Sequence, residues 1–311
     1  MNYDNKFGIP QIRYGPIEWL ADPLRASIEE AVTKNIGREW KIKTRKDLSE
    51  FAYHRCAIVS DDSFTVFFKY SEAADARRQF EIELSNLRTL SEKAGVSIPL
   101  PIDIIQIDNG TMLIMESLET IQRGPRQLRD IAATLARIHR VKGEYFGFET
   151  DGFWGPLYQD NTPTQDWETF FRERRLLPLL KTATDSGNIP SSVVSDVETI
   201  ITRLPDLCGP GITPSLLHGD AQQNNFITTA ERTYVIDPNV YYGNPEMDLA
   251  LINSFQPVPN DVFDAYREEM PIDPGFYKRR DLWRIPLYLA AVALEGPMHL
   301  DRLTDALGKY L

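Results

Sequence analysis

Cysteine is scarce in this chain of 311 residues, which contains only Cys56 and Cys208. The two lie far apart with no motif around either, which argues against a disulfide framework or a zinc site and favours a reducing compartment. The N-terminus, MNYDNKFGIPQ, lacks the basic start and apolar core of a secretory signal. The longest apolar run, at 285–294, is too short to span a bilayer. We therefore expect a cytoplasmic protein with no membrane partner.

Positive charge is also in deficit. The chain has 34 Lys and Arg against 45 Asp and Glu, a net charge of −11 at pH 7. This balance argues against nucleic acid or an anionic membrane as the main partner. A hydrophobic share of 42% and a charged share of 25% are ordinary for a globular enzyme. The length permits one large domain or two lobes, and a monomer or weak homodimer is expected.

Glycine is missing from one notable stretch. Between Trp40 and Lys69 there is none, and the segment includes KTRKDLSEFAYHRCAIVSDDS. Loops that cradle phosphates usually carry glycines, because backbone amides must approach the anion closely. Either other residues hold such a loop open, around Ser49 to Tyr53, or any nucleotide binding here is weakened.

The most informative motif lies at 216–238, which reads LLHGDAQQNNFITTAERTYVIDP. Asp220 is followed five residues later by Asn225, and a short apolar strand then delivers Asp237. Phosphoryl transfer needs a carboxylate beside the acceptor hydroxyl and two oxygen ligands for Mg²⁺ on the phosphates. Each piece alone is ordinary turn chemistry. Their order favours a kinase-type site with Asp220 as catalytic base and with Asn225 and Asp237 as Mg²⁺ ligands.

The organisation of the chain predicts an α+β protein with a two-lobed, protein-kinase-like fold. Residues 1–20 are expected to form an extended arm. Residues 21–116 are expected to form a nucleotide-binding lobe, with strands at 64–70, 102–107 and 112–115 and helices at 24–32 and 74–93. The turn Asp108-Asn109-Gly110 is a strong hairpin signal. Residues 117–311 are expected to form a mostly helical catalytic and substrate lobe, with helices at 128–139, 166–180, 191–204, 247–254, 262–269 and 274–294.

Lys69 is the candidate for holding the nucleotide phosphates. It ends the strand FTVFFKY and shares a face with Thr65 and Phe67. A lysine in this position can also snorkel at a strand edge, so its assignment depends on the downstream motif. The segment Glu116, Ser117 and Leu118 follows the last strand of the first lobe and is placed to be a hinge that reads the adenine edge.

Glu83 is the predicted partner of Lys69. The apolar face of the helix at 74–93 is formed by Phe80, Leu84, Leu87 and Leu90. Glu83 falls on the flank of this face, whereas Glu81 lies towards solvent. An acid on a buried flank breaks the binary pattern, and such breaks concentrate at functional sites. The alternative is the edge of an ordinary amphipathic helix.

With these residues identified, the chain resembles the fructosamine kinase (ketosamine-3-kinase) family, relatives of aminoglycoside phosphotransferases. Besides LLHGDAQQNN, the resemblance rests on IDPNVYYGNPEMDLA at 236–250 and FGFETDGFWGPLYQDNTPTQDWETFFRERRLLPLL at 146–180. The shared features run through most of 24–295. Three features depart from the family pattern: the absent glycine-rich loop, Asn224 in place of a glycine, and LEGPMHL at 294–300.

The resemblance implies ATP with Mg²⁺ as cofactors and a sugar hydroxyl of a ketosamine as acceptor. It also implies roles for individual residues. Asp248 matches an aspartate that braces the catalytic loop, and Trp167, Arg175 and Tyr242 lie in segments that would flank the acceptor pocket. Two other functions compete with ketosamine phosphorylation: an O-phosphotransferase acting on an antibiotic or natural product, and a pseudokinase that only binds.

Overall fold

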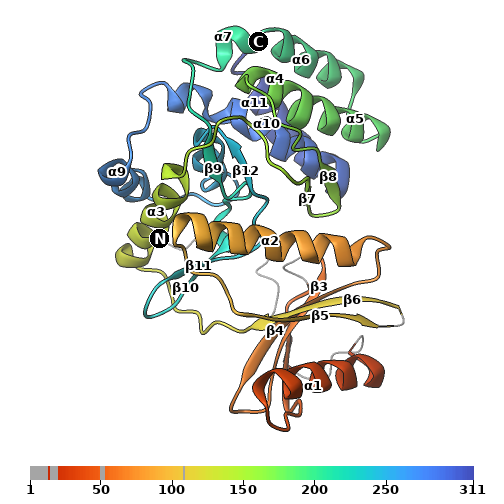
Figure 1. Cartoon of the computed structure of the whole chain (residues 1–311). Helices are drawn as coiled ribbons and strands as arrows, with labels where there is room; N and C mark the ends of the chain where they lie inside the picture. The colour runs from red at the N-terminus through yellow and green to blue at the C-terminus, as the bar shows by residue number, and fades with distance from the viewer. Residues whose placement is uncertain (1–12, 15–19, 50–52, 108) are drawn as a thin grey trace. The chain divides into compact units, whose positions relative to one another are not determined.

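The computed structural model describes residues 13–14, 20–49, 53–107 and 109–311. Two compact units are formed, one from Met1–Ser85 with Pro99–Glu119 and one from Asn86–Ile98 with Thr120–Leu311 (Figure 1). The expected N-terminal arm falls mostly outside the described residues, as do Asp108 of the predicted turn and 50–52 of the glycine-free loop. In the described part of the chain, no helix is long and apolar enough to cross a membrane.

The first unit contains an antiparallel sheet with the order β1-β2-β3-β4-β6-β5 in the described residues. Its strands are β1 (Arg13–Tyr14), β2 (Thr44–Asp47), β3 (Arg55–Ser60), β4 (Thr65–Ser71), β5 (Pro101–Ile107) and β6 (Gly110–Glu116). In β4, Lys69 lies between Cys56 of β3 and Leu113 of β6. Lys69 is therefore on an interior strand, where the backbone is fixed on both sides.

Helix α1 (Asp22–Ile36) covers one face of this sheet (Figure 1). Ile28 and Val32 of the helix pack with Val66 and Phe68 of β4 in one core of buried side chains. The alternation predicted for β4 is therefore present, because Val66 and Phe68 face α1 and leave Lys69 to the opposite face.

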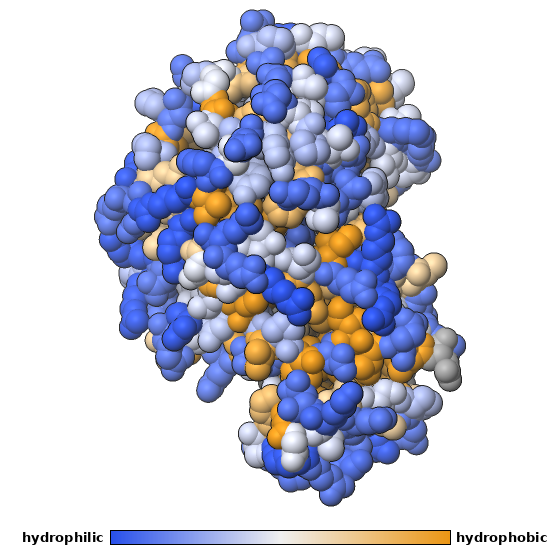
Figure 2. Space-filling view, viewed as in Figure 1, coloured by the Kyte–Doolittle hydropathy of each residue, from blue (hydrophilic) through white to orange (hydrophobic). Residues whose placement is uncertain are grey.

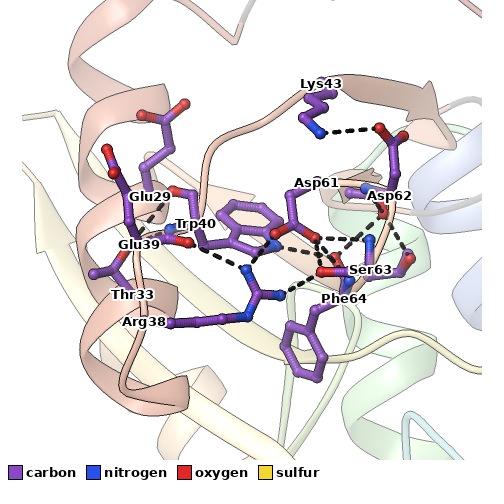
Figure 3. Close-up of polar contacts among 12 residues, drawn as sticks. Glu29, Thr33, Arg38, Glu39, Trp40, Lys43, Asp61, Asp62, Ser63 and Phe64 are labelled. Carbon is purple, nitrogen blue, oxygen red and sulfur yellow. Dashed lines mark hydrogen bonds and ion pairs between the residues drawn. The ribbon is translucent and has the colours of Figure 1, made fainter.

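The turn between β3 and β4 is tied to the segment after α1 by a polar cluster (Figure 3). Arg38 donates to Asp61 Oδ2 at 2.6 Å and to Ser63 Oγ at 2.5 Å. The Trp40 indole donates to the Phe64 carbonyl at 2.9 Å. The hydrogen bond from Arg38 holds the pKa of Asp61 well below its usual range. This cluster fixes the start of β4, the strand that carries Lys69.

Helix α2 (Ala76–Ala94) lies against the other face of the sheet through its first half. Phe80 and Leu87 are fully buried and Leu84 is nearly so, as the predicted apolar face requires. Residues 86–94 of this helix belong to the second unit.

The second unit is mostly helical. Its helices are α3 (Pro125–Arg140), α4 (Trp167–Phe171), α5 (Leu177–Asp185), α6 (Ser191–Thr202), α7 (Leu204–Leu207), α8 (Glu246–Leu251), α9 (Asn260–Glu269), α10 (Phe276–Glu295) and α11 (Leu300–Leu307). A π-helical turn, Arg172–Leu176, joins α4 to α5, and the 3₁₀ turns are Gln223–Asn225 and Pro297–His299. Helix α10 is buried through its middle, 281–292, and packs against α5, α8 and α11. Hydrophilic residues cover most of the visible face of these helices (Figure 2).

Three short strand pairs lie in this unit, and two of them contain parts of the motif at 216–238. They are β7 (Gly152–Trp154) with β8 (Leu157–Gln159), β9 (Ser215–Leu217) with β12 (Tyr241–Gly243), and β10 (Phe226–Thr228) with β11 (Thr233–Val235). All three pairs are antiparallel. They place the motif at 216–238 on a β insert among the helices.

Candidate active site

The predicted catalytic loop begins where β9 ends. The His218 carbonyl accepts a hydrogen bond from the Asn239 N–H at 2.8 Å, and the His218 N–H donates to Asp248. Gly219 has φ +79°, and a Cβ there would lie 1.8 Å from the Asn239 carbonyl oxygen. Only glycine meets both demands, a left-handed backbone and a close approach of a second chain segment. Gly219 therefore sets the turn that presents Asp220.

Asp248 braces this loop from α8. Its Oδ2 accepts the His218 N–H at 2.7 Å, and its Oδ1 accepts the Gly219 N–H at 3.0 Å. The side chain is fully buried. A buried carboxylate that accepts two backbone N–H groups holds a loop more firmly than neutral partners do. This is the bracing geometry that the resemblance implies for Asp248.

A second layer behind Asp248 was not identified from the sequence. His139, at the end of α3, lies with Nε2 3.1 Å from Asp248 Oδ2 and with Nδ1 2.7 Å from the hydroxyl of Tyr266 on α9. Both side chains are buried. The row Tyr266, His139, Asp248 thus links three helices to the catalytic loop.

His218 connects the loop to the predicted metal strand. Its Nε2 lies 3.0 Å from the Ile236 carbonyl and its Nδ1 3.3 Å from the Asp220 N–H. These partners require a proton on Nε2 and none on Nδ1. Burial lowers the pKa of His218, in keeping with a neutral ring. The histidine acts as a spacer between Asp220 and the residue that precedes Asp237.

Both carboxylate oxygens of Asp220 are held by amides. Gln222 Nε2 donates to Oδ1 at 2.8 Å, and Asn225 Nδ2 donates to Oδ2 at 2.9 Å and to the Asp220 carbonyl at 2.8 Å. Burial, with the nearby charge of Asp237, raises the pKa of Asp220 to about 6, against the lowering effect of the Gln222 and Asn225 hydrogen bonds. A carboxylate poised near neutral pH is suited to general-base work.

Asn225 and Asp237 meet at one end of the β10–β11 hairpin. Phe226 pairs with Val235, and beyond them Ile236 N–H donates to the Asn225 carbonyl at 3.0 Å. Asp237 has φ +54°, a left-handed conformation that aspartate tolerates better than most residues. Backbone strain of this kind is concentrated at functional sites.

These two residues fit the requirements of Mg²⁺. The amide nitrogen of Asn225 is committed to Asp220, which leaves its oxygen to face a cation. Among the described residues there is no cluster of three or more His, Cys, Asp or Glu that could hold a metal. Mg²⁺ needs no such cage, since it commonly takes one or two protein oxygens together with waters and substrate phosphates. The roles of Asn225 and Asp237 as ligands stay a prediction.

Arg123, which was not identified from the sequence, also supports the Asn225 turn. Its Nη2 donates to the carbonyls of Gln223 at 2.8 Å and Phe226 at 2.5 Å, on either side of Asn225. Burial lowers the pKa of Arg123. A single guanidinium thus ties both ends of the turn that presents the predicted metal ligand.

In the first unit, Lys69 Nζ lies 2.8 Å from Glu83 Oε1. The side chains are 8% and 14% exposed, so the pair is largely removed from water. Glu81, by contrast, is exposed and pairs with Arg77 on the helix surface. The pairing that the helical wheel indicated is present, and its contact with a nucleotide stays a prediction.

The predicted hinge residues are partly committed to the sheet. Glu116 Oε1 accepts the Leu100 N–H at 2.9 Å, and Glu116 N–H donates to the Leu100 carbonyl at 2.9 Å. Ser117 N–H donates to the Thr65 carbonyl at 3.2 Å. Among the three predicted hinge residues, Leu118 is therefore the candidate whose N–H would read the adenine edge.

Side-chain hydrogen bonds shape the loop between β2 and β3 where it is described. Asp47 Oδ1 accepts the N–H of Ser49 at 3.0 Å and its hydroxyl at 2.7 Å, and Cys56 N–H donates to Ser49 Oγ at 3.1 Å. These bonds close the base of the loop. Residues 50–52, part of the region expected to hold it open, lie outside the described residues.

The predicted acceptor residues are buried. Trp167 stacks on Phe171, and Tyr242 on β12 is 6% exposed. Arg175 lies in the π-helical turn, stacks over Tyr241 and donates to Asn161 Oδ1 at 2.6 Å. Contact of these residues with an acceptor stays a prediction.

One small cavity lies beside the catalytic loop. Its lining includes Arg175 and Gly219 together with Trp154 of β7, Tyr241 and Trp283. Of the three predicted acceptor residues, Arg175 is the one that lines this cavity.

Comparison with known proteins agrees with this geometry. A model of the fructosamine kinase family matches residues 24–311. A probable ketoamine kinase of Pasteurella multocida is 25% identical over 280 residues, covering 89% of this chain and 95% of the relative. A candidate fructosamine-3-kinase of Thermobifida fusca, solved by crystallography, is 28% identical with a TM-score of 0.79, covering 91% of this chain and 98% of that one.

A more distant likeness concerns the fold alone. An aminoglycoside phosphotransferase, crystallised with AMP-PNP and hygromycin B, is 16% identical with a TM-score of 0.59, covering 91% of this chain and 96% of that one. These likenesses confirm the predicted α+β, kinase-like fold. Because the family match extends over nearly the whole chain, the protein belongs to the fructosamine kinase family of phosphotransferases.

Proposed function

We propose that this phosphotransferase moves the γ-phosphoryl group of ATP to a sugar hydroxyl of a ketosamine, with Asp220 as the catalytic base. The observation that carries the proposal is the state of Asp220. Its carboxylate is held on both oxygens, by Gln222 and Asn225, and burial raises its pKa to about 6. Such a group can accept a proton from a hydroxyl at neutral pH.

In the proposed reaction, the acceptor oxygen forms a bond to the γ-phosphorus while the bond from that phosphorus to the β–γ bridging oxygen breaks. The acceptor proton passes to Asp220, and ADP leaves. Little covalent chemistry is asked of the protein, so positioning and charge stabilisation account for most of the rate. The brace from Asp248 to the N–H groups of His218 and Gly219 supports this positioning.

Three groups of residues would bind the nucleotide in this proposal. Lys69, oriented by Glu83 at 2.8 Å, supplies positive charge to the phosphates. Leu118 N–H reads the adenine edge. Asn225 and Asp237 would hold Mg²⁺, which neutralises developing charge on the phosphates when bound. The crystallisation of a protein of this fold with AMP-PNP supports the use of a nucleotide.

The acceptor class is the finer part of the proposal. Relatives named as ketoamine kinases support a ketosamine, and the aminoglycoside phosphotransferase of the same fold makes an antibiotic hydroxyl the natural competitor.

The test is a panel of fructosamines, ribulosamines and aminoglycosides with Mg²⁺ and ATP, followed by ³¹P NMR of the products. A new phosphate monoester with a ketosamine supports the proposal. A monoester with an aminoglycoside alone would move the function to the antibiotic class. ATP binding without any phosphorylated product would indicate a binding protein with a kinase fold.

A further inference from the structure

The side chain of Gln222 holds the oxygen of Asp220 that the proposed reaction uses. Its Nε2 donates to Asp220 Oδ1 at 2.8 Å. The other oxygen, Oδ2, is occupied by Asn225 at 2.9 Å. Asn225 is also the predicted metal ligand, so its amide is not available to move. Oδ1 is therefore the oxygen left for an acceptor hydroxyl, and Gln222 donates to it, while the Trp154 indole is a further donor to the same carboxylate.

This contact is not needed to shape the loop. The turn is already closed by main-chain bonds, from Gln222 N–H to the Asp220 carbonyl at 2.8 Å and from Asn225 N–H to the Gln222 carbonyl at 3.0 Å. Arg123 holds the carbonyls of Gln223 and Phe226 in the same turn. The side-chain amide of Gln222 adds a hydrogen bond to a backbone that is independently held.

The neighbouring glutamine behaves differently. Gln223 has the same side chain in the same turn, but its Nε2 donates to the Gln256 carbonyl at 2.7 Å. The side-chain amide of a glutamine in this turn can therefore bond away from Asp220, as that of Gln223 does. The contact with the carboxylate is made by the glutamine at position 222 and not by its neighbour. Gln223 provides a matched control.

We infer that Gln222 is a positioning residue that guards Asp220 against water, and that a polyhydroxylated acceptor, bound by further contacts, takes its place on Oδ1. This inference rests on the proposed kinase function. A single water has no other contact to offset the loss of the Gln222 hydrogen bond to a charged group. An acceptor sugar has such further contacts, because its remaining hydroxyls bind elsewhere in the site and offset the loss of the Gln222 hydrogen bond.

The guarded side reaction is hydrolysis of ATP. A water oxygen would bond to the γ-phosphorus while the bond to the bridging oxygen breaks, giving ADP and inorganic phosphate, and its proton would pass to Asp220. Transfer and hydrolysis thus use the same base and differ only in the attacking hydroxyl. The ratio of the two rates reports on the guard, whereas a general loss of structure lowers both.

The experiment compares the full-length parent with Gln222→Ala, Gln222→Leu and Gln223→Ala. Phosphate release from Mg²⁺-ATP is measured without acceptor, and phosphorylated product is measured with the best ketosamine. In both Gln222 variants we expect the ratio of hydrolysis to transfer to rise about tenfold, the effect of losing one hydrogen bond to a charged group. Gln223→Ala should keep the parental ratio. Thermal unfolding of all four proteins controls for folding.

The outcomes distinguish failure of the role of Gln222 from failure of the proposed function. A parent that transfers phosphate while both Gln222 variants keep its ratio overturns the role of Gln222 and leaves the proposed function standing. A proportional fall of both rates in the two variants overturns it as well, because Gln222 would then only support the loop. A parent that makes no phosphorylated ketosamine overturns the proposed function, and the inference with it.

Discussion

The fully buried carboxylate of Asp248 accepts the backbone N–H of His218 at 2.7 Å. Its second oxygen accepts the next N–H along the chain, and its first is also 3.1 Å from His139 Nε2. The predicted catalytic loop is therefore braced through its main chain, and the side chain of the proposed base Asp220 takes no part in this brace. Asp220 is left free to exchange hydrogen bonds while its backbone stays in place.

Replacing Asp248 tests this brace. In Asp248→Asn, one of the two backbone N–H groups faces an amide NH₂ in place of an oxygen, inside a fully buried site. We expect a loss of about 3 kcal/mol in the free energy of unfolding, the cost of an unsatisfied buried group that had a charged partner. Urea denaturation measures it, with Asp305→Asn on the exposed face of α11 as the control. Equal stability of the two variants would show that Asp248 is not a brace.

Lys69 and Glu83 should act as one unit. Lys69→Met should lower kcat/KM by an amount that corresponds to about 3 kcal/mol of transition-state stabilisation, as when one charge-stabilising donor is lost. Glu83→Ala should lower kcat/KM by less. The double variant should be clearly non-additive because the two side chains are in direct contact at 2.8 Å. Glu81→Ala, which breaks only a surface pair, is the matched control for the helix. Strictly additive losses would mean that Lys69 works without Glu83.

Asp237 should be required for metal-dependent binding of the nucleotide. Asp237→Ala removes a hard oxygen ligand that Mg²⁺ prefers, so calorimetry should find that Mg²⁺ no longer strengthens ATP binding. Phosphoryl transfer should be lost together with it. If the variant binds Mg²⁺-ATP as the parent does, Asp237 serves only to end its strand.

Asp281 should contribute stability that depends on pH. Burial alone would raise its pKa, but the hydrogen bond from Lys309 and the charge of Arg284 hold the pKa below its usual value. The folded state therefore binds fewer protons than the unfolded state. The contribution is present above about pH 4, the unfolded pKa, and is lost as pH falls through the folded pKa.

The comparison of the parent with Asp281→Asn isolates this contribution. The variant should be less stable at pH 7, and the difference in urea midpoint should shrink steadily below pH 4. A difference that stays constant down to pH 2 would show that the charge of Asp281 plays no part.

The parts of the site that the sequence predicts are those encoded locally. Asp220, Asn225 and Asp237 lie within one short segment, so a strand, a turn and a hairpin suffice to bring them together. Glu83 followed from the period of a single helix. Glu83 stands out because an acid breaks the apolar pattern of its helix. Asp220, Asn225 and Asp237 stand out because together they complete a motif within one short segment.

The supports of the site could not be found in this way. His139 and Tyr266 meet Asp248 from α3 and α9, more than a hundred residues apart in sequence. Arg123 was not identified either, since its partners Gln223 and Phe226 lie 100 and 103 residues further along the chain. The β7–β8 hairpin escaped prediction because strands of three residues carry no readable alternation. These contacts are set by tertiary packing, which periodicity does not encode.

The most direct test of the account is the turnover of Asp220→Asn with Mg²⁺-ATP and a ketosamine, set beside its affinity for Mg²⁺-ATP. The asparagine keeps the size of the side chain but cannot accept the acceptor proton. We predict a loss of kcat of roughly two to four orders of magnitude, the range for a general base, with nearly unchanged nucleotide affinity. A variant that turns over at close to the parental rate would contradict the assignment of Asp220 as the base.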